Sequence, residues 1–264
     1  MVPDLQLRPF RFHGTGITAV VSTRHGGVSA GCYDSLNLGD HVGDDHQAVV
    51  ENRRRLAAAV GAGQLTIADQ RHTDRVAVVE AALAGRGHEG GADAAAAFPA
   101  TDALITDLPG AALTVLVADC APVLLFDPRR RAIGVAHSGR AGTVHGVVPK
   151  TVAAMGAAYG SDPRDLLVGI GPAIGASSYE IGAAEAAQVM TAFGAAGTKL
   201  LTPSRPGHAT FDLAGAIRSQ LSACDVPAAS VHDMAIDTRT ATADFFSDRA
   251  ARPCGRFAAV AMLA

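Results

Sequence analysis

Two side chains that bind metal ions well, the thiol of Cys120 and the imidazole of His137, lie on either side of a short charged turn. Apolar runs rich in Val, Ile, Leu and Phe flank that turn, a pattern that predicts strand, turn and strand. If Asp127 pairs with Ala132 across the turn, Cys120 lies opposite Gly139, two residues from His137. A thiolate and an imidazole are typical zinc ligands, and paired strands would hold them rigidly. The open end of this hairpin is therefore the best candidate for chemistry in the chain.

The elements around the hairpin are predicted to be a mixture of strands and helices. Apolar runs predict strands at 113–117, 123–126, 132–136, 166–170 and 231–236, and helical spacing predicts helices at 47–60, 142–159, 183–193 and 211–223. The Gly- and Ala-rich segment Gly85–Thr101 lacks a periodic pattern and is predicted to be a mobile loop beside the candidate site. No regular strand–helix alternation and no Gly-rich nucleotide-binding motif occurs. We expect an α+β (mixed α/β) fold of mixed sheets layered with helices.

Composition limits the class of protein. The chain has 264 residues, of which 48% are hydrophobic, so it can fill a sizeable core. We expect a single domain over 1–264, with 1–9 as a flexible or peripheral N-terminus. A net charge of −3 with no obvious basic stretch argues against a dedicated nucleic-acid-binding protein, although a local phosphate site is compatible with it.

Cellular location is predicted from what the sequence lacks. No apolar run approaches the roughly 18 residues of a membrane span, and the first ten residues do not resemble a secretory signal. The four cysteines are widely scattered, which favours reduced thiols over a disulfide framework; they are Cys32, Cys120, Cys224 and Cys254. We therefore expect a cytoplasmic monomer that does not bind membranes.

Short motifs in order along the chain resemble those of the YfiH-type laccase-domain family, also called polyphenol oxidase or peptidoglycan editing factor proteins. The resemblance extends from about Val21 to Leu263. It rests on Ser22–Ser29, Asn37-Leu38-Gly39, Glu51-Asn52-Arg53, Gln70–His72, Ala118–Val123, Ala136-His137, Gly171–Ile174, Tyr179-Glu180, Phe245–Ser247 and Gly255-Arg256. So many elements in the right order make the resemblance specific.

The resemblance implies one zinc ion, held by His72, Cys120 and His137. The residues alone would leave His72 as an ordinary histidine between strands, whereas the hairpin already pairs Cys120 with His137. Three protein ligands leave a fourth tetrahedral position for water or substrate, as in catalytic zinc sites. The family is further implied to act on purine nucleosides, by phosphorolysis of adenosine, inosine and guanosine and by deamination of adenosine. A nucleoside and phosphate would then be the partners of the protein.

Residues near the metal ligands are candidates for further roles, with Cys120 itself counted as catalytic. Asp119 could shuttle a proton or orient a ligand histidine, but it could equally be a structural residue at a strand end. Phosphorolysis needs a cation that binds phosphate, and a guanidinium suits it. Arg53, by its match to the Asn-Arg pair of the family, and Arg24, in a Gly-rich loop that could also be a plain turn, are the candidates. Asn37 is a further candidate for substrate binding.

The sequence departs from the family pattern just after His137. The family usually reads His-Ala-Gly-Trp-Arg-Gly where this chain reads His-Ser-Gly-Arg-Ala-Gly over 137–142. The arginine expected at position 141 is therefore Ala141, and its substrate contact would be lost unless Arg140 replaces it. None of these changes removes a metal ligand, so we expect the metal site to be retained.

Three alternatives remain open at this stage. A multicopper oxidase needs clustered His-x-His ligands, and the ten histidines of this chain form none. Zn²⁺ is thus the expected cofactor, although copper could occupy the same Cys/His site because it outcompetes zinc at most such sites. A peptidoglycan-precursor editing hydrolase would use the same metal for amide cleavage. A non-catalytic zinc-binding or redox-sensing domain would bind metal without turning over a nucleoside.

Overall fold

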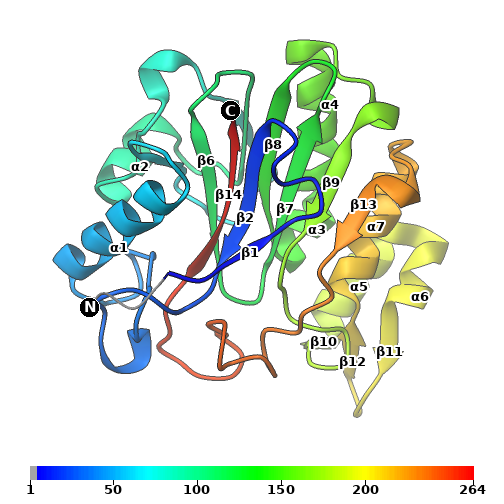
Figure 1. Ribbon diagram of the computed structural model, residues 1–264. Helices are drawn as coiled ribbons and strands as arrows, with labels where there is room; N and C mark the ends of the chain where they lie inside the picture. The colour runs from blue at the N-terminus through cyan, green and yellow to red at the C-terminus, as the bar shows by residue number, and fades with distance from the viewer. Residues whose placement is uncertain (1–4) are drawn as a thin grey trace.

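Two large β-sheets packed face to face form the centre of the protein, as the computed structural model of residues 5–264 shows (Figure 1). The first sheet has the order β1 (Leu7–Pro9), β2 (Ile17–Ser22), β14 (Phe257–Leu263), β6 (Ala112–Val117) and β3 (Leu65–Ile67). Its strands are antiparallel to their neighbours, except that β3 runs parallel to β6.

The second sheet contains the hairpin predicted to carry the candidate site. Its order is β13 (Val231–Asp233), β9 (Leu167–Ile170), β7 (Ala121–Asp127), β8 (Ala132–Ser138), β5 (Ala103–Thr106) and β4 (Val76–Val78). The outer pairs are parallel and the inner pairs antiparallel. A small antiparallel sheet lies beside it, formed by β10 (Glu180–Gly182), β12 (His208–Phe211) and β11 (Leu201–Pro203).

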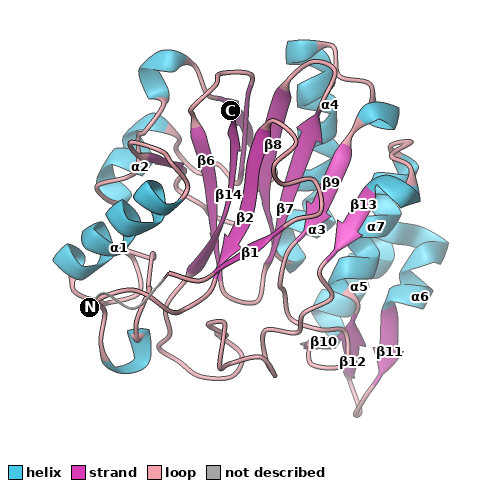
Figure 2. Cartoon of the chain, viewed as in Figure 1, coloured by secondary structure: helices cyan, strands magenta, loops and turns pink. Residues whose placement is uncertain are grey.

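Helices cover the outer faces of both sheets, so the protein has four layers (Figure 2). The helices of the described residues are α1 (His46–Ala59), α2 (Gly91–Ala97), α3 (Arg140–His145), α4 (Val147–Tyr159), α5 (Ala183–Phe193), α6 (Gly197–Leu200) and α7 (Leu213–Ala223). On the first sheet, Leu56 of α1 is buried in one apolar cluster with Val260. On the second, Met155 of α4 shares a cluster with Leu125. A third apolar cluster, which includes Phe126, fills the space between the sheets.

Aspartates cap two of the longer helices, α1 and α7. Asp45 accepts a hydrogen bond from the Ala48 amide at the start of α1, and Asp212 accepts one from the Gly215 amide at the start of α7, each at 2.8 Å. Such caps satisfy amides that have no partner within the helix. Short 3-10 helices occupy Gly31–Tyr33, Ala81–Leu83, Pro163–Asp165, Gly194–Ala196 and Ala228–Ser230.

The α+β fold and the hairpin are confirmed, and the register is the expected one, with Asp127 opposite Ala132 and Ala121 opposite Ser138. The helix predicted over 142–159 is instead two helices, α3 and α4, separated at Gly146, whose φ of 83° is in the left-handed region that glycine tolerates. The loop predicted over Gly85–Thr101 contains α2, because its alanines have high helix propensity even without an apolar stripe.

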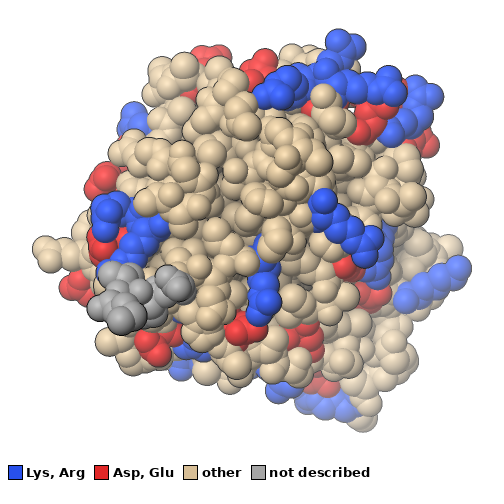
Figure 3. Space-filling view, viewed as in Figure 1, with Lys and Arg blue, Asp and Glu red and all other residues tan. Residues whose placement is uncertain are grey.

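The predicted peripheral N-terminus is described only in part. Leu7–Pro9 forms the edge strand β1, whereas residues 1–4 lie outside the described residues. Within residues 5–264, no helix is long and apolar enough to cross a membrane. On the face shown in Figure 3, most basic side chains lie close to acidic ones. The expectation that the chain does not bind nucleic acid stays a prediction.

Candidate functional site

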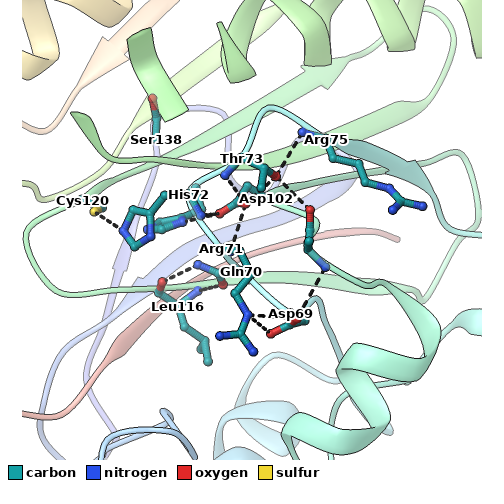
Figure 4. Close-up of polar contacts among 12 residues, drawn as sticks. Asp69, Gln70, Arg71, His72, Thr73, Arg75, Asp102, Leu116, Cys120 and Ser138 are labelled. Atoms are coloured by element: carbon teal, nitrogen blue, oxygen red, sulfur yellow. Dashed lines mark hydrogen bonds and ion pairs between the residues drawn. The ribbon is translucent and has the colours of Figure 1, made fainter. Parts of the chain in front are cut away.

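Three side chains with metal-binding atoms come together where the two large sheets meet a long loop. His72 lies in the loop between β3 and β4, Cys120 immediately precedes β7, and His137 lies in β8. Their ligand atoms all lie within 4.8 Å of one another, and His72 Nε2 is 3.8 Å from Cys120 Sγ (Figure 4). These are the three residues that the family resemblance implied, and the structure brings them together.

The hairpin fixes the cysteine against the histidines as its register predicted. Gly139 follows β8 and faces Cys120, and a Cβ atom at position 139 would lie 2.6 Å from Cys120 Sγ and 3.1 Å from His72 Cδ2. Any side chain there would displace a metal-binding atom. Glycine at 139 is therefore required by the close approach of the ligands.

Asp102, which was missed from the sequence, orients both histidines. It is 1% exposed, and its carboxylate lies 2.8 Å from His137 Nδ1, which leaves Nε2 as the free nitrogen of that ring. The same carboxylate accepts hydrogen bonds from three consecutive amides, those of Arg71, His72 and Thr73, at 3.1, 2.9 and 2.7 Å. His72 has a φ of 60°, a conformation that costs a non-glycine residue about 1–2 kcal/mol, and these bonds offset that cost.

The cysteine thiol and the histidine rings of the site shift each other's pKa. Burial opposes charge on the Cys120 thiol, but the neighbouring rings of His137 and His72 outweigh it and lower its pKa to about 6. Burial also opposes charge on His137, but Cys120 and Asp102 outweigh it and raise its pKa to about 9. The thiol thus gives up its proton easily. One thiolate and two imidazoles suit zinc or copper, so the residues present fit a bound metal ion.

The three residues open into a cleft of about 360 Å³. Its lining includes apolar residues such as Leu116 and Ile174, and basic side chains from the loop of residues 234–256 between β13 and β14. We call this segment the C-terminal loop; in Figure 1 it runs along the lower edge of the molecule. The remaining lining residues are His41, Gln70, Val117, Ala118, Asp119, Tyr179, Leu213, Asp248, Arg249, Arg252 and Arg256.

Asp119 lines the cleft, but it holds the C-terminal loop and contacts no ligand histidine among the described residues. Its carboxylate accepts hydrogen bonds from Thr238 Oγ1 at 2.6 Å and from the Arg249 amide at 2.7 Å. The role of orienting a histidine, considered for Asp119, belongs to Asp102. The structural role considered for Asp119 fits its contacts.

The structure does not bring Arg53 or Asn37 into this cleft. Arg53 is 2% exposed and donates to the carbonyls of Leu38, Gly87 and His88 at 2.9, 3.0 and 3.0 Å. Burial lowers its pKa to about 10. Asn37 is fully buried and accepts a hydrogen bond from the Arg256 amide at 2.8 Å. Both side chains organise loops behind the site.

The other two arginines considered for substrate binding also lie elsewhere. Arg24 donates to the carbonyls of Asp34 and Thr242, and its guanidinium lies 4.5 Å from the centre of the Phe246 ring. Arg140 begins α3 and donates to Gln188 of α5. Neither side chain lines the cleft.

Several residues that line the cleft belong to the family motifs found in the sequence, although the sequence assigned them no role. The Gln70 amide pairs with both backbone groups of Leu116 at 2.8 Å, which joins the His72 loop to the first sheet. Tyr179 and Arg256 belong to two of these motifs, and Arg249 lies two residues after the motif that ends at Ser247. The one sequence feature that could have indicated Asp102 is weaker: it is an acidic residue just before the buried strand β5.

Comparison with known proteins identifies the family. Residues 18–264 match the family model described as multi-copper polyphenol oxidoreductase laccase. The chain belongs to this family. A purine nucleoside phosphorylase of Mycobacterium tuberculosis is 38% identical over 251 residues, which cover 92% of this chain and 91% of that protein. One of Deinococcus radiodurans is 40% identical over 229 residues, covering 86% and 81% respectively.

Solved structures of the family confirm the fold and the resemblance found from the motifs. The protein YfiH of Bacillus licheniformis superposes with a TM-score of 0.90 at 30% identity, covering 95% of this chain and 94% of that one. YlmD of Geobacillus stearothermophilus superposes with a TM-score of 0.89 at 33% identity, covering 94% and 92%.

Proposed function

We propose that this protein is a zinc-dependent purine nucleoside phosphorylase of the laccase-domain family that also deaminates adenosine. The observation that carries the proposal is the convergence of His72, Cys120 and His137 on one cleft. A volume of about 360 Å³ is in the range of small-molecule sites. The relatives named purine nucleoside phosphorylase support the same class of substrate.

The proposed reactions differ in the nucleophile. In phosphorolysis, a phosphate oxygen attacks C1′ of the ribose, the C1′–N9 bond breaks, and the purine leaves with a proton. In deamination, water adds to C6 of adenine and ammonia leaves, which gives inosine. When bound, Zn²⁺ supplies Lewis-acid chemistry, by polarising an oxygen or lowering the pKa of a bound water.

The residues of the cleft suit a nucleoside on either route. Leu116 and Ile174 offer apolar surface for a purine ring. Burial raises the pKa of Tyr179 to about 12, so its hydroxyl stays protonated and can donate a hydrogen bond to a substrate oxygen or ring nitrogen. Asp102 keeps Nδ1 of His137 occupied, so that only Nε2 is free to bind the metal.

The ligand set supports zinc over a multicopper centre, in spite of the family description. Within residues 5–264, His72, Cys120 and His137 form the one group of metal-binding side chains found. Oxygen reduction by the multicopper route needs several copper ions and their histidine clusters, and the sequence has no His-x-His. We therefore propose a single zinc ion.

Product analysis of the zinc-loaded protein tests the proposal. The protein is incubated with adenosine, with and without phosphate, beside Cys120→Ala. Free adenine that forms only with phosphate and is absent from the variant supports phosphorolysis at this site, and inosine supports deamination. No product with zinc still bound would contradict the proposal, and an amide substrate for the editing hydrolase would then be tested at the same site.

A further inference from the structure

The C-terminal loop contributes basic groups to the same cleft as the metal ligands. Arg249, Arg252 and Arg256 all line the same cavity as Cys120, whereas the arginines suggested by the sequence do not. Phosphorolysis must bring a phosphate that carries up to two negative charges next to the nucleoside. Guanidinium groups are well suited to this task because they bind phosphate oxygens through two parallel hydrogen bonds.

The three arginines differ in how far the protein already uses their donors. Arg256 gives Nη1 to the carbonyls of Cys254 and Gly255, both at 3.0 Å, and its side chain is 20% exposed. Arg249 gives Nη1 to the Glu180 carbonyl at 2.9 Å, and Nε and Nη2 have no partner among the described residues. Arg252 donates Nε to the Asp248 carbonyl at 3.3 Å and pairs through Nη2 with the Asp248 carboxylate, which leaves Nη1 without a partner among the described residues, and its side chain is 73% exposed. Arg249 and Arg252 therefore retain donors for a ligand.

The loop is fixed close to the metal ligands through Asp119. Its carboxylate accepts the Arg249 amide, and the next residue along the chain is the ligand Cys120. The guanidinium of Arg249 lies 5.4 Å from the centre of the Tyr179 ring, which limits the directions it can take. The carboxylate of Asp248 is the opposing charge, since it pairs with Arg252 and lies 3.7 Å from Arg256 Nη2. An entering phosphate would compete with it.

We propose that Arg249 and Arg252 form the binding site for the inorganic phosphate that attacks the nucleoside, with Asp119 as the residue that positions Arg249. This inference rests on the proposed phosphorolysis for its chemical purpose. The anion site itself, made by two arginines of the C-terminal loop, does not depend on the nucleoside and can be tested without it. Arg256 and Asn37 support the loop from behind.

The test uses two measurements on the zinc-loaded protein. Calorimetric titration with inorganic phosphate, without nucleoside, measures anion binding directly, and initial rates give the KM for phosphate at saturating inosine. Arg249→Ala and Arg252→Ala should each weaken phosphate binding and raise its KM about 10-fold, the scale of a lost charged hydrogen bond. The KM for inosine and the zinc content should be unchanged.

Arg129→Ala is the matched control. This arginine lies in the turn at the far end of the β7–β8 hairpin, its side chain is 76% exposed, and it pairs only with Asp165 among the described residues. Its loss removes the same charge and should leave phosphate binding unaltered. Arg249→Lys and Arg252→Lys keep the charge and should recover part of the affinity.

The outcomes separate this inference from the proposed function. Phosphorolysis with an unchanged KM for phosphate in the double variant Arg249→Ala/Arg252→Ala would overturn the inference and leave the function standing. Phosphate binding that depends on the arginines, without turnover of any nucleoside, would support the site and overturn the function. If the wild-type protein binds no phosphate in the titration and the arginine variants behave like it, the inference fails.

Discussion

The two walls of the cleft are built in opposite ways. On the metal side, His137 is 4% exposed within β8, and both strands of its hairpin are buried along their whole length. On the other side, the C-terminal loop has no helix or strand over 234–256, and Arg249 and Arg252 are exposed. Metal ligands must be held within fractions of an ångström, whereas long guanidinium side chains can adjust to an anion. The rigid wall therefore suits the metal and the loop wall suits the anion.

Two aspartates connect these walls to the rest of the fold. Asp102 joins the His72 loop to β8, because its carboxylate hydrogen-bonds both the His72 amide and the His137 ring. Asp119 joins the C-terminal loop to the start of β7. Changes at the ligands should therefore affect the metal, changes at Asp102 should affect metal and stability together, and changes at Asp119 should affect the loop alone.

The largest effect is expected for Cys120→Ala, which removes the only thiolate of the ligand set. Two imidazoles remain, and metal affinity should fall by more than about 100-fold, with loss of all turnover. The melting temperature of the metal-free protein should change little, because Cys120 lies at the rim and is partly exposed. Elemental analysis, thermal melts and product assays check this, with exposed Cys32→Ala as the control. Stoichiometric zinc in the variant would contradict the assigned ligand set.

Asp102→Asn should lower both metal affinity and stability. The buried carboxylate accepts from one ring nitrogen and three amides, and an asparagine NH₂ would face donors. We expect a loss of about 3 kcal/mol in the free energy of unfolding and of about 10–100-fold in zinc affinity. Denaturant unfolding and competition with a chelating dye measure these values. Asp162→Asn, at an exposed pair with Arg164, should cost far less than Asp102→Asn, because solvent screens an exposed ion pair. Equal losses of stability in both variants would contradict the role of Asp102 in stabilising the fold and orienting the ligand histidines.

Asp119→Asn should loosen the C-terminal loop without releasing the metal. The KM for phosphate should rise about 5-fold while zinc content stays the same, because the negative charge that accepts the Arg249 backbone amide is removed but the arginine remains. Thr238→Val removes only the second contact, from Thr238 Oγ1, and should give a smaller change in the same direction. Steady-state rates at varied phosphate decide this. Loss of zinc in Asp119→Asn would mean that Asp119 acts on the ligands instead of the loop.

The fold could be predicted from the sequence where one local pattern decides the structure. The register of the β7–β8 hairpin followed from its turn, and the helix over Ala183–Phe193 was predicted with the bounds observed. The helix predicted over 142–159 was wrong at Gly146 because apolar spacing continues across the left-handed residue that divides it. The helix α2 was missed since its alanines give no apolar stripe.

The metal ligands could be predicted from the sequence, whereas the arginines of the C-terminal loop could not. The turn chemistry brought Cys120 and His137 together, but His72 needed the family resemblance, because its place depends on a carboxylate distant in sequence. Asp102 reaches the metal ligands, and the arginines of the C-terminal loop reach the cleft, only through contacts between elements far apart in the chain. Arg53 looked like an anion ligand because the sequence does not show that three carbonyls surround it.

The smallest effect is expected for Arg140→Ala, which tests whether the departure from the family pattern after His137 matters. Arg140 begins α3, where a cation opposes the helix dipole, and its guanidinium points to Gln188 of α5 instead of lining the cleft. We expect less than about a twofold change in kcat/KM for nucleoside and in the KM for phosphate, a change below the scale of a lost charged hydrogen bond. Steady-state kinetics beside Arg249→Ala measure the contrast directly. A loss as large as that of Arg249→Ala would place the substrate against α3 and move the anion site away from the C-terminal loop.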